Sequence, residues 1–140
     1  MVDDLDPVLE SPKLPIKRIL IVDDIPDIAM SLKRGLERFQ FRVEAFTDPE
    51  QALTAFFSDK YDFALLDVNM PGMNGFELCR ELMKKDSNLV VCFLTAFQNY
   101  RSDYDLQYPM LGTDCFLEKP MPVSQLATLI RKMLAKREKP

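Results

Sequence analysis

Polar side chains able to handle phosphate and a metal ion follow four short apolar segments of the sequence. They are Asp23 and Asp24 after residues 16–22, Asp67 after residues 63–66, Thr95 after residues 89–94, and Lys119 close behind residues 115–117. Carboxylates without histidine or cysteine ligands favour Mg²⁺ over zinc, and Mg²⁺ commonly takes one or two carboxylates plus phosphate oxygens. A lysine adds a compact charge for phosphate, and a carboxylate can be the covalent acceptor of a phosphoryl group. The set therefore indicates Mg²⁺-dependent phosphoryl transfer.

The absence of histidine limits the chemistry further. None of the 140 residues is histidine, which excludes a Ser-His-Asp triad, a histidine-ligated zinc site and a phosphohistidine donor on this chain. Phosphoryl transfer depends on positioning and charge neutralisation more than on a general base. Carboxylates, a lysine and a hydroxyl are therefore sufficient for it.

Strands and helices alternate along the segments that must position these residues. Short apolar runs predict strands, and apolar residues three and four apart predict helices between them. The expected strands are residues 16–22, 41–46, 63–66, 89–94 and 115–117; the expected helices begin at Pro26 and at Asp48-Pro49-Glu50 and cover residues 76–84 and 123–135. This order predicts an α/β fold, with a doubly wound, five-stranded parallel sheet between two helical layers. Ligands of such sheets bind beyond the carboxyl ends of the strands.

Each candidate residue also has an ordinary structural explanation. Asp23 or Asp24 alone would more often be a helix cap or turn former, and Asp67 alone could equally cap the next helix. Thr95 alone would more often be a strand-end hydroxyl, and Lys119 a solvated lysine. Three carboxylates gathered at one edge are harder to explain in this way, because packed like charges cost stability unless a cation neutralises them. We therefore favour a shared site.

Composition excludes several other classes. The net charge is −4 and no basic face is clustered, so nucleic-acid binding by this domain is not expected. The apolar runs fall short of the about 20 residues that span a bilayer, and the acidic N-terminus is unlike a secretory signal, so no membrane association is expected. Cys79, Cys92 and Cys115 lack C-x-x-C spacing and are expected to be reduced core thiols in the cytoplasm.

Four motifs resemble the receiver domains of two-component response regulators. They are Ile19–Asp24, Leu65–Gly75, Phe93–Ala96 and Phe116–Pro120. Their occurrence together and in this order makes the resemblance specific. It covers about residues 16–136, with residues 1–15 expected to be a flexible leader and 137–140 a tail. It implies a flavodoxin-like (CheY-like) three-layer sandwich.

The resemblance also implies a role for each matching residue. Asp67 would be the phosphorylated aspartate, Asp23 and Asp24 the acidic pair that holds Mg²⁺ (or Mn²⁺), Asn69 a metal ligand through its backbone carbonyl, Lys119 the partner of the phosphoryl group, and Thr95 and Phe116 the switch residues. The Lys119–Pro120 bond would be cis. From the residues alone, a plain core aromatic is the preferred explanation of Phe116.

Partners follow from the same resemblance. A sensor histidine kinase or a phosphotransfer protein would donate to Asp67, and an unidentified downstream protein would read the switched surface. A homodimer is left open. The chain is not expected to be an enzyme beyond its own phosphorylation and slow autodephosphorylation, and it is expected in the cytoplasm.

Residues 97–111 depart from the family pattern. Receivers usually carry an alanine-rich helix here, whereas this segment contains Phe97, Tyr100, Tyr104, Tyr108 and a helix-breaking Pro109. An atypical fourth helix with an aromatic stripe is expected. Core packing and a partner surface explain the stripe equally well. The bulky Phe97 is expected to shield the acyl phosphate from water and so to slow autodephosphorylation.

Three rival functions would make different demands on the sequence. An aspartyl-phosphate phosphatase would need a second aspartate two residues after the nucleophile, where Asn69 stands, and would carry its nucleophile on the first strand. A nucleotide-binding domain would need G-x-G-x-x-G after the first strand, which is absent. A receiver-like scaffold that never accepts phosphate stays open.

Overall fold

The computed structural model describes residues 15–96 and 115–138, which build a five-stranded sheet. The strands are β2 (Arg18–Val22), β3 (Arg42–Phe46), β4 (Phe63–Leu66), β5 (Val90–Thr95) and β6 (Phe116–Glu118). Every pairing is parallel, in the order β3-β2-β4-β5-β6. The predicted doubly wound sheet is confirmed, and each predicted strand lies within two residues of an observed one.

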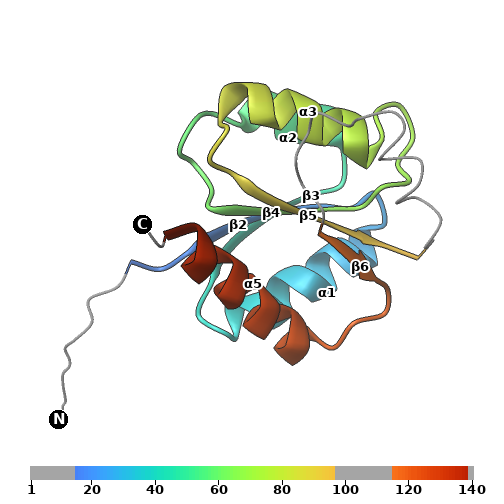
Figure 1. The fold of residues 1–140 in the computed structure, drawn as a ribbon. Coiled ribbons are helices and arrows are strands. Elements are labelled where there is room, and N and C mark those ends of the chain that lie inside the picture. The colour runs from blue at the N-terminus through green and yellow to red at the C-terminus, as the bar shows by residue number, and fades with distance from the viewer. Residues whose placement is uncertain (1–14, 97–114, 139–140) are drawn as a thin grey trace, which may run out of the picture.

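Helices cover both faces of the sheet (Figure 1). They are α1 (Pro26–Glu37), α2 (Pro49–Ala55), α3 (Gly75–Lys85) and α5 (Val123–Glu138). Helices α2 and α3 lie on one face, and α1 and α5 on the other. Alternate residues of β2 serve the two layers: Leu20 and Val22 belong to the apolar cluster beneath α2 and α3, whereas Ile19 and Ile21 belong to the cluster beneath α1 and α5. The strand is buried on both faces, as its continuous apolar run predicts.

The helix starts follow local sequence signals. A proline occupies the first turn of α1 and of α2, where its missing N–H costs nothing. The Asp48 carboxylate accepts a hydrogen bond from the Glu50 N–H at 2.9 Å and so caps α2. The helix therefore begins at Asp48-Pro49-Glu50 as predicted, and the polar end of β3 serves as its cap.

The strand order reverses between β2 and β4. The chain passes from β2 outward to β3 and then crosses back to pair β4 with the other edge of β2. The carboxyl ends of β2 and β4 therefore flank the point at which neighbouring crossovers leave toward opposite faces. Open α/β sheets bind their ligands at such a point.

Two cysteines are paired rather than reduced. Cys92 and Cys115 form a disulfide with their Cα atoms 4.7 Å apart, while Cys79 is a free, buried thiol. The expectation of three reduced thiols is wrong for this pair. Cys92 and Cys115 are far apart in sequence, and only the β5–β6 register brings them opposite each other, since Phe93 pairs with Phe116.

Two further expectations concern a membrane-spanning helix and the fourth helix. Within residues 15–96 and 115–138, no helix has the length and apolar character needed to cross a membrane. The expected fourth helix in residues 97–111, together with Phe97, lies outside the described residues.

Candidate functional site

The parallel ladders hold two aspartates side by side at the carboxyl edge of the sheet. The Asp23 N–H donates to the Phe46 carbonyl at 3.1 Å, and the Asp67 N–H donates to the Val22 carbonyl at 2.9 Å. Both aspartates are therefore fixed by the sheet rather than by loop conformation. Because Val22 pairs with Leu66, the residues that follow are neighbours.

The β5–β6 pair carries the other two candidates to the same edge. The Lys119 N–H donates to the Thr95 carbonyl at 2.9 Å, which extends this ladder past the end of β6. Thr95 is buried. The Lys119–Pro120 peptide bond is cis, as the resemblance implied.

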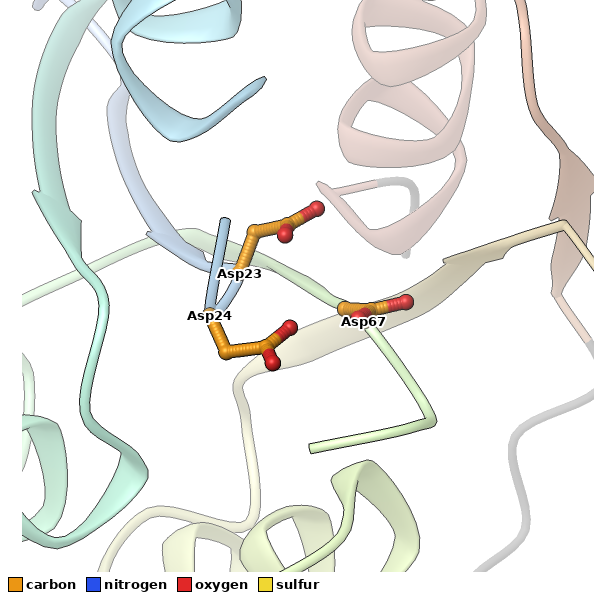
Figure 2. Close-up of side chains that lie close together, drawn as sticks. All are labelled: Asp23, Asp24 and Asp67. Atoms are coloured by element: carbon orange, nitrogen blue, oxygen red, sulfur yellow. The ribbon is translucent and has the colours of Figure 1, made fainter. Parts of the chain in front are cut away.

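The three carboxylates converge (Figure 2). Asp23, Asp24 and Asp67 each offer an oxygen, and these atoms all lie within 4.8 Å of one another. Asp23 is 2% and Asp67 7% exposed, while Asp24 is half-buried. Charges this close and this dry repel one another strongly unless a cation intervenes.

Lys119 supplies one positive charge to this cluster. Its Nζ lies 2.8 Å from Asp23 Oδ2 and 3.4 Å from Asp67 Oδ1. The second oxygen of Asp23 accepts a hydrogen bond from the Ile25 N–H at 3.0 Å. Asp23 is therefore both the turn former that ordinary statistics favour and a member of the cluster.

The electrostatics leave the cluster undercompensated. Burial raises the pKa of Asp67 to about 6; the charge of Asp23 adds to this rise, and Lys119 opposes it. Burial acts to lower the pKa of Lys119, but the hydrogen bond and charge of Asp23, helped by Asp67, raise it overall. One ammonium thus does not fully neutralise the group, which favours a further cation.

The loop after Asp67 is held by a feature that the sequence interpretation missed. Gly75 begins α3 directly against the backbone of the aspartate: a Cβ there would lie 2.3 Å from the Asp67 carbonyl oxygen. Asn74 and Glu77 form a capping box, in which each side chain accepts the other's backbone N–H, at 2.8 and 2.9 Å. Asn followed three residues later by Glu was a readable signal for it.

The two remaining candidate residues are Asn69 and Phe116. Asn69 is exposed, two residues beyond Asp67. Phe116 is half-buried on the α2–α3 face, with its ring centroid 5.1 Å from that of Phe93 and 6.2 Å from that of Phe76. This packing fits the plain core-aromatic explanation, so its switch role stays a prediction.

The donor set fits a hard divalent cation. It is made of carboxylate oxygens, which suit Mg²⁺ or Mn²⁺ better than zinc. The carboxylates are preassembled and carry excess negative charge. The backbone carbonyl of Asn69 stays a predicted further ligand. The chemistry such a site supports is the capture of a phosphoryl group by a carboxylate beside a metal and a lysine.

Sequence comparisons agree with this geometry. The family model for the response regulator receiver domain matches residues 19–131. The transcriptional regulatory protein PrrA of Mycobacterium tuberculosis is 34% identical over 122 residues, which cover 86% of this chain and 51% of PrrA. The heme response regulator HssR of Staphylococcus saprophyticus is 36% identical over 115 residues, 82% of this chain and 50% of HssR. The chain thus spans about half the length of these relatives.

Solved structures show the same likeness. A CheY-like receiver domain protein from Methanospirillum hungatei JF-1 superposes with a TM-score of 0.78 at 29% identity, covering 89% of this chain and 98% of that one. The response regulator TrrA of Thermotoga maritima, in complex with Mg²⁺-BeF, gives a TM-score of 0.73 at 34% identity, covering 84% and 99%.

Proposed function

Because the chain belongs to the response regulator receiver domain family of two-component signalling, we propose that Asp67 accepts a phosphoryl group and thereby switches a partner-binding surface. The donor is a sensor histidine kinase or a phosphotransfer protein, as for receiver domains in general. The observation that supports the role of Asp67 is its buried carboxylate at the end of a central strand, within 4.8 Å of two other carboxylates and 3.4 Å from Lys119 Nζ.

In the proposed reaction an oxygen of Asp67 forms a new bond to phosphorus. The P–N bond of the donor phosphohistidine breaks, and the imidazole nitrogen keeps the electron pair. The ladder bond from the Asp67 N–H fixes the nucleophile along this path. Lys119, already beside the carboxylate, pairs with the phosphoryl oxygens, because a lysine ammonium is a compact charge on a flexible side chain.

Asp23, Asp24 and Asp67 would hold Mg²⁺, with the Asn69 backbone carbonyl as a further ligand; Mn²⁺ would serve in its place. When bound, the metal neutralises charge on the phosphoryl oxygens. The side chains' own contribution is a preassembled cradle, with Asp23 oriented by the Ile25 N–H. Such preorganisation avoids rearrangement during the reaction.

Readout begins at the β5–β6 edge. Thr95 is proposed to donate a hydrogen bond to the phosphoryl group, and the Phe116 side chain to change its rotamer in response. Each charge-assisted hydrogen bond contributes roughly 1.5–3 kcal/mol, so two or three can bias a two-state surface. The chain catalyses only its own phosphorylation and slow dephosphorylation, acts in the cytoplasm, and passes the signal to a downstream protein or a second copy.

The test is phosphorylation by a small acyl phosphate. With Mg²⁺, intact-mass spectrometry should show one phosphoryl adduct, and peptide mapping should place it on Asp67. EDTA and Asp67→Asn should each remove the adduct, whereas Asp62→Asn, at the opposite end of the sheet, should keep it. An unmodified wild-type chain whose Mg²⁺ site is occupied would instead support the scaffold that never accepts phosphate.

A further inference from the structure

The β5–β6 pair carries two cysteines in bonding register. Phe93 is opposite Phe116, so Cys92 and Cys115, one residue earlier on each side, are opposite each other. Their Cα atoms are 4.7 Å apart, inside the range of about 4.4–6.8 Å that a disulfide accepts. The strand register therefore holds the two cysteines at a distance that suits a disulfide.

The surroundings suit the reduced form equally well. Both sulfurs approach Met133 of α5: its Sδ lies 3.4 Å from Cys92 Sγ and 3.6 Å from Cys115 Sγ. They lie in the apolar cluster beneath α1 and α5, where a thiol packs as a small hydrophobe. Since this layer has a large apolar core of its own, the fold does not require the covalent bond.

We propose that Cys92 and Cys115 form a reversible redox modification site, oxidised by hydroperoxides and reduced by dithiols, that cross-links the two strands leading to Thr95 and Lys119. Its effect on signalling rests on the function proposed above. Cys92 and Thr95 lie in β5, and Cys115 and Lys119 directly flank β6. The cross-link ties the strands together just before the site, and so restrains the shift of β5 relative to β6 that a response at Thr95 requires.

Accessibility assigns different parts to the two cysteines. Cys115 is half-buried, whereas Cys92 is fully buried. The Cys115 thiolate attacks the peroxide oxygen, breaks the O–O bond, and becomes a sulfenic acid with release of water or an alcohol. The Cys92 thiol then displaces the sulfenic oxygen as water and forms the S–S bond. Exchange with a dithiol returns both thiols and leaves the reductant oxidised.

Cys79 is the internal control. It lies in α3, in the cluster on the other face of the sheet. Burial raises the pKa of its thiol to about 12, which suppresses the reactive thiolate. Oxidation of the β5–β6 pair should therefore leave one thiol per chain unmodified.

The first experiment counts thiols. Protein treated with hydrogen peroxide or with dithiothreitol is denatured, alkylated with N-ethylmaleimide and weighed intact. The reduced chain should carry three adducts and the oxidised chain one, and dithiothreitol should restore three. The Cys79→Ala variant should carry two adducts when reduced and none when oxidised. The Cys115→Ala variant should carry two adducts in both states. The melting temperature of the oxidised chain should rise on the order of 10 °C, because the bond closes a long loop in the unfolded state.

Peptide mapping of the wild type under non-reducing conditions keeps the site testable even if a variant fails to fold. Three adducts after peroxide, a bond to Cys79, or a bond between two chains would overturn it.

A second experiment compares phosphorylation by acyl phosphate plus Mg²⁺ in the two redox forms. The oxidised chain should react several-fold more slowly, and Cys115→Ala should show no such dependence.

Equal rates in the two forms would overturn the coupling. Absence of phosphorylation in both forms would instead remove the proposed function, and the coupling with it. The thiol count would still decide whether the site exists.

Discussion

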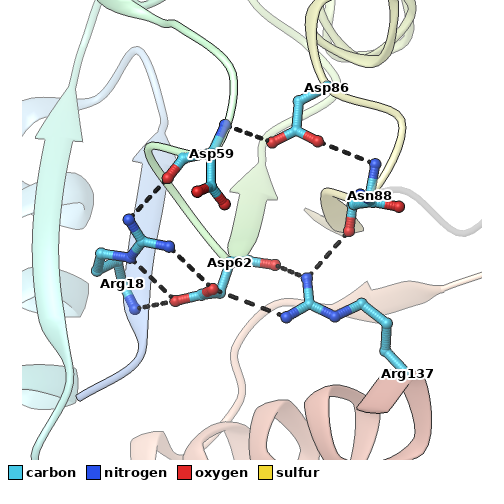
Figure 3. A network of polar contacts seen from close by, with 6 residues as sticks. All are labelled: Arg18, Asp59, Asp62, Asp86, Asn88 and Arg137. Atoms are coloured by element: carbon cyan, nitrogen blue, oxygen red, sulfur yellow. Dashed lines mark hydrogen bonds and ion pairs between the residues drawn. The ribbon is translucent and has the colours of Figure 1, made fainter. Parts of the chain in front are cut away.

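The two ends of the sheet both gather acidic residues, but they treat them differently. At the amino end a polar network joins segments that lead into β2, β4 and β5 and the end of α5 (Figure 3). Its members are Arg18, Asp59, Asp62, Asp86, Asn88 and Arg137. Here Asp62 accepts from the Arg18 backbone N–H at 2.8 Å and from its Nε and Nη2 at 3.2 Å. Asp86 accepts from the backbone N–H groups of Asp59 and Asn88 at 2.8 and 3.0 Å.

The carboxyl end lacks this balance among the described residues. Three carboxylates lie within 4.8 Å of one another beside Lys119, and the pKa of Asp67 rises to about 6. Burial acts to raise the pKa of Asp62 as well, but hydrogen bonds from Arg18 lower it overall. Similar residue types therefore stabilise the fold where hydrogen bonds lower the pKa of the acid, and form the candidate ligand site where burial and neighbouring acids raise it. The following variants test that contrast.

Gly75→Ala should have the largest effect. It disturbs the backbone at the carboxyl end of the sheet and leaves the charge unchanged. The new Cβ would lie 2.3 Å from the Asp67 carbonyl, a backbone atom that has little room to move. We expect a loss of about 3 kcal/mol in the free energy of unfolding by urea, together with slower phosphorylation. Gly35→Ala is the control: the nearest atoms to its Cβ would be those of the Val123 side chain, at 2.9 Å, and the substitution should cost less. Equal losses would mean that Gly75 has no special place at the site.

Matched substitutions at the two ends should have opposite signs. Asp62→Asn weakens charge-assisted hydrogen bonds and should lower the free energy of unfolding by about 2 kcal/mol. Asp67→Asn relieves repulsion and should raise it by about 1 kcal/mol in EDTA at neutral pH. Urea denaturation of both variants and the wild type measures this. Destabilisation by Asp67→Asn would show that the carboxyl end is already balanced without a metal.

The pH dependence should also differ in sign. Since the pKa of Asp67 is raised in the folded state, its stabilising effect is present below its ordinary pKa and lost as the pH rises through about 6. The pKa of Asp62 is lowered, so its contribution is present above the ordinary value and lost as the solution becomes more acidic. In EDTA the wild type should lose about 1 kcal/mol relative to Asp67→Asn between roughly pH 5 and 7.

Added Mg²⁺ should reverse that loss, because metal and proton compete for the same carboxylates. Urea denaturation at several pH values, with and without Mg²⁺, provides the measurement. A wild type and an Asp67→Asn variant that change in parallel would assign the titration to another group.

Arg137→Ala should have the smallest effect. Its guanidinium donates to the carbonyls of Asp62 and Asn88 at 3.3 and 3.0 Å and lies 3.7 Å from the Asp62 carboxylate, but it is partly exposed. We expect a loss of about 0.5–1 kcal/mol and an unchanged phosphorylation rate. Lys132→Ala, exposed on the same helix, should change neither. A slowed phosphorylation in Arg137→Ala would mean that the two ends are coupled.

Much of the fold could be predicted because its signals are local. Apolar runs of strand length and proline at helix starts needed only neighbouring residues, and the observed strands agree with the prediction within two residues. The convergence of Asp23, Asp67 and Lys119 was also predictable, since parallel strands bring their carboxyl ends to one edge. The network around Asp62 was not predictable, because its members have no shared spacing in the sequence. The requirement for glycine at position 75 was not predictable, since the crowding arises from the Asp67 backbone folded against it.

The sequence by itself determined which residues end the strands and, through the total absence of histidine, that no histidine takes part in the proposed chemistry on this chain. Only the tertiary structure decided which acids are compensated and which are not, and that Cys92 meets Cys115. The reason is physical: residue order fixes local conformation and pattern, whereas the pKa of a carboxylate and the partner of a thiol depend on groups brought close by strand register and burial.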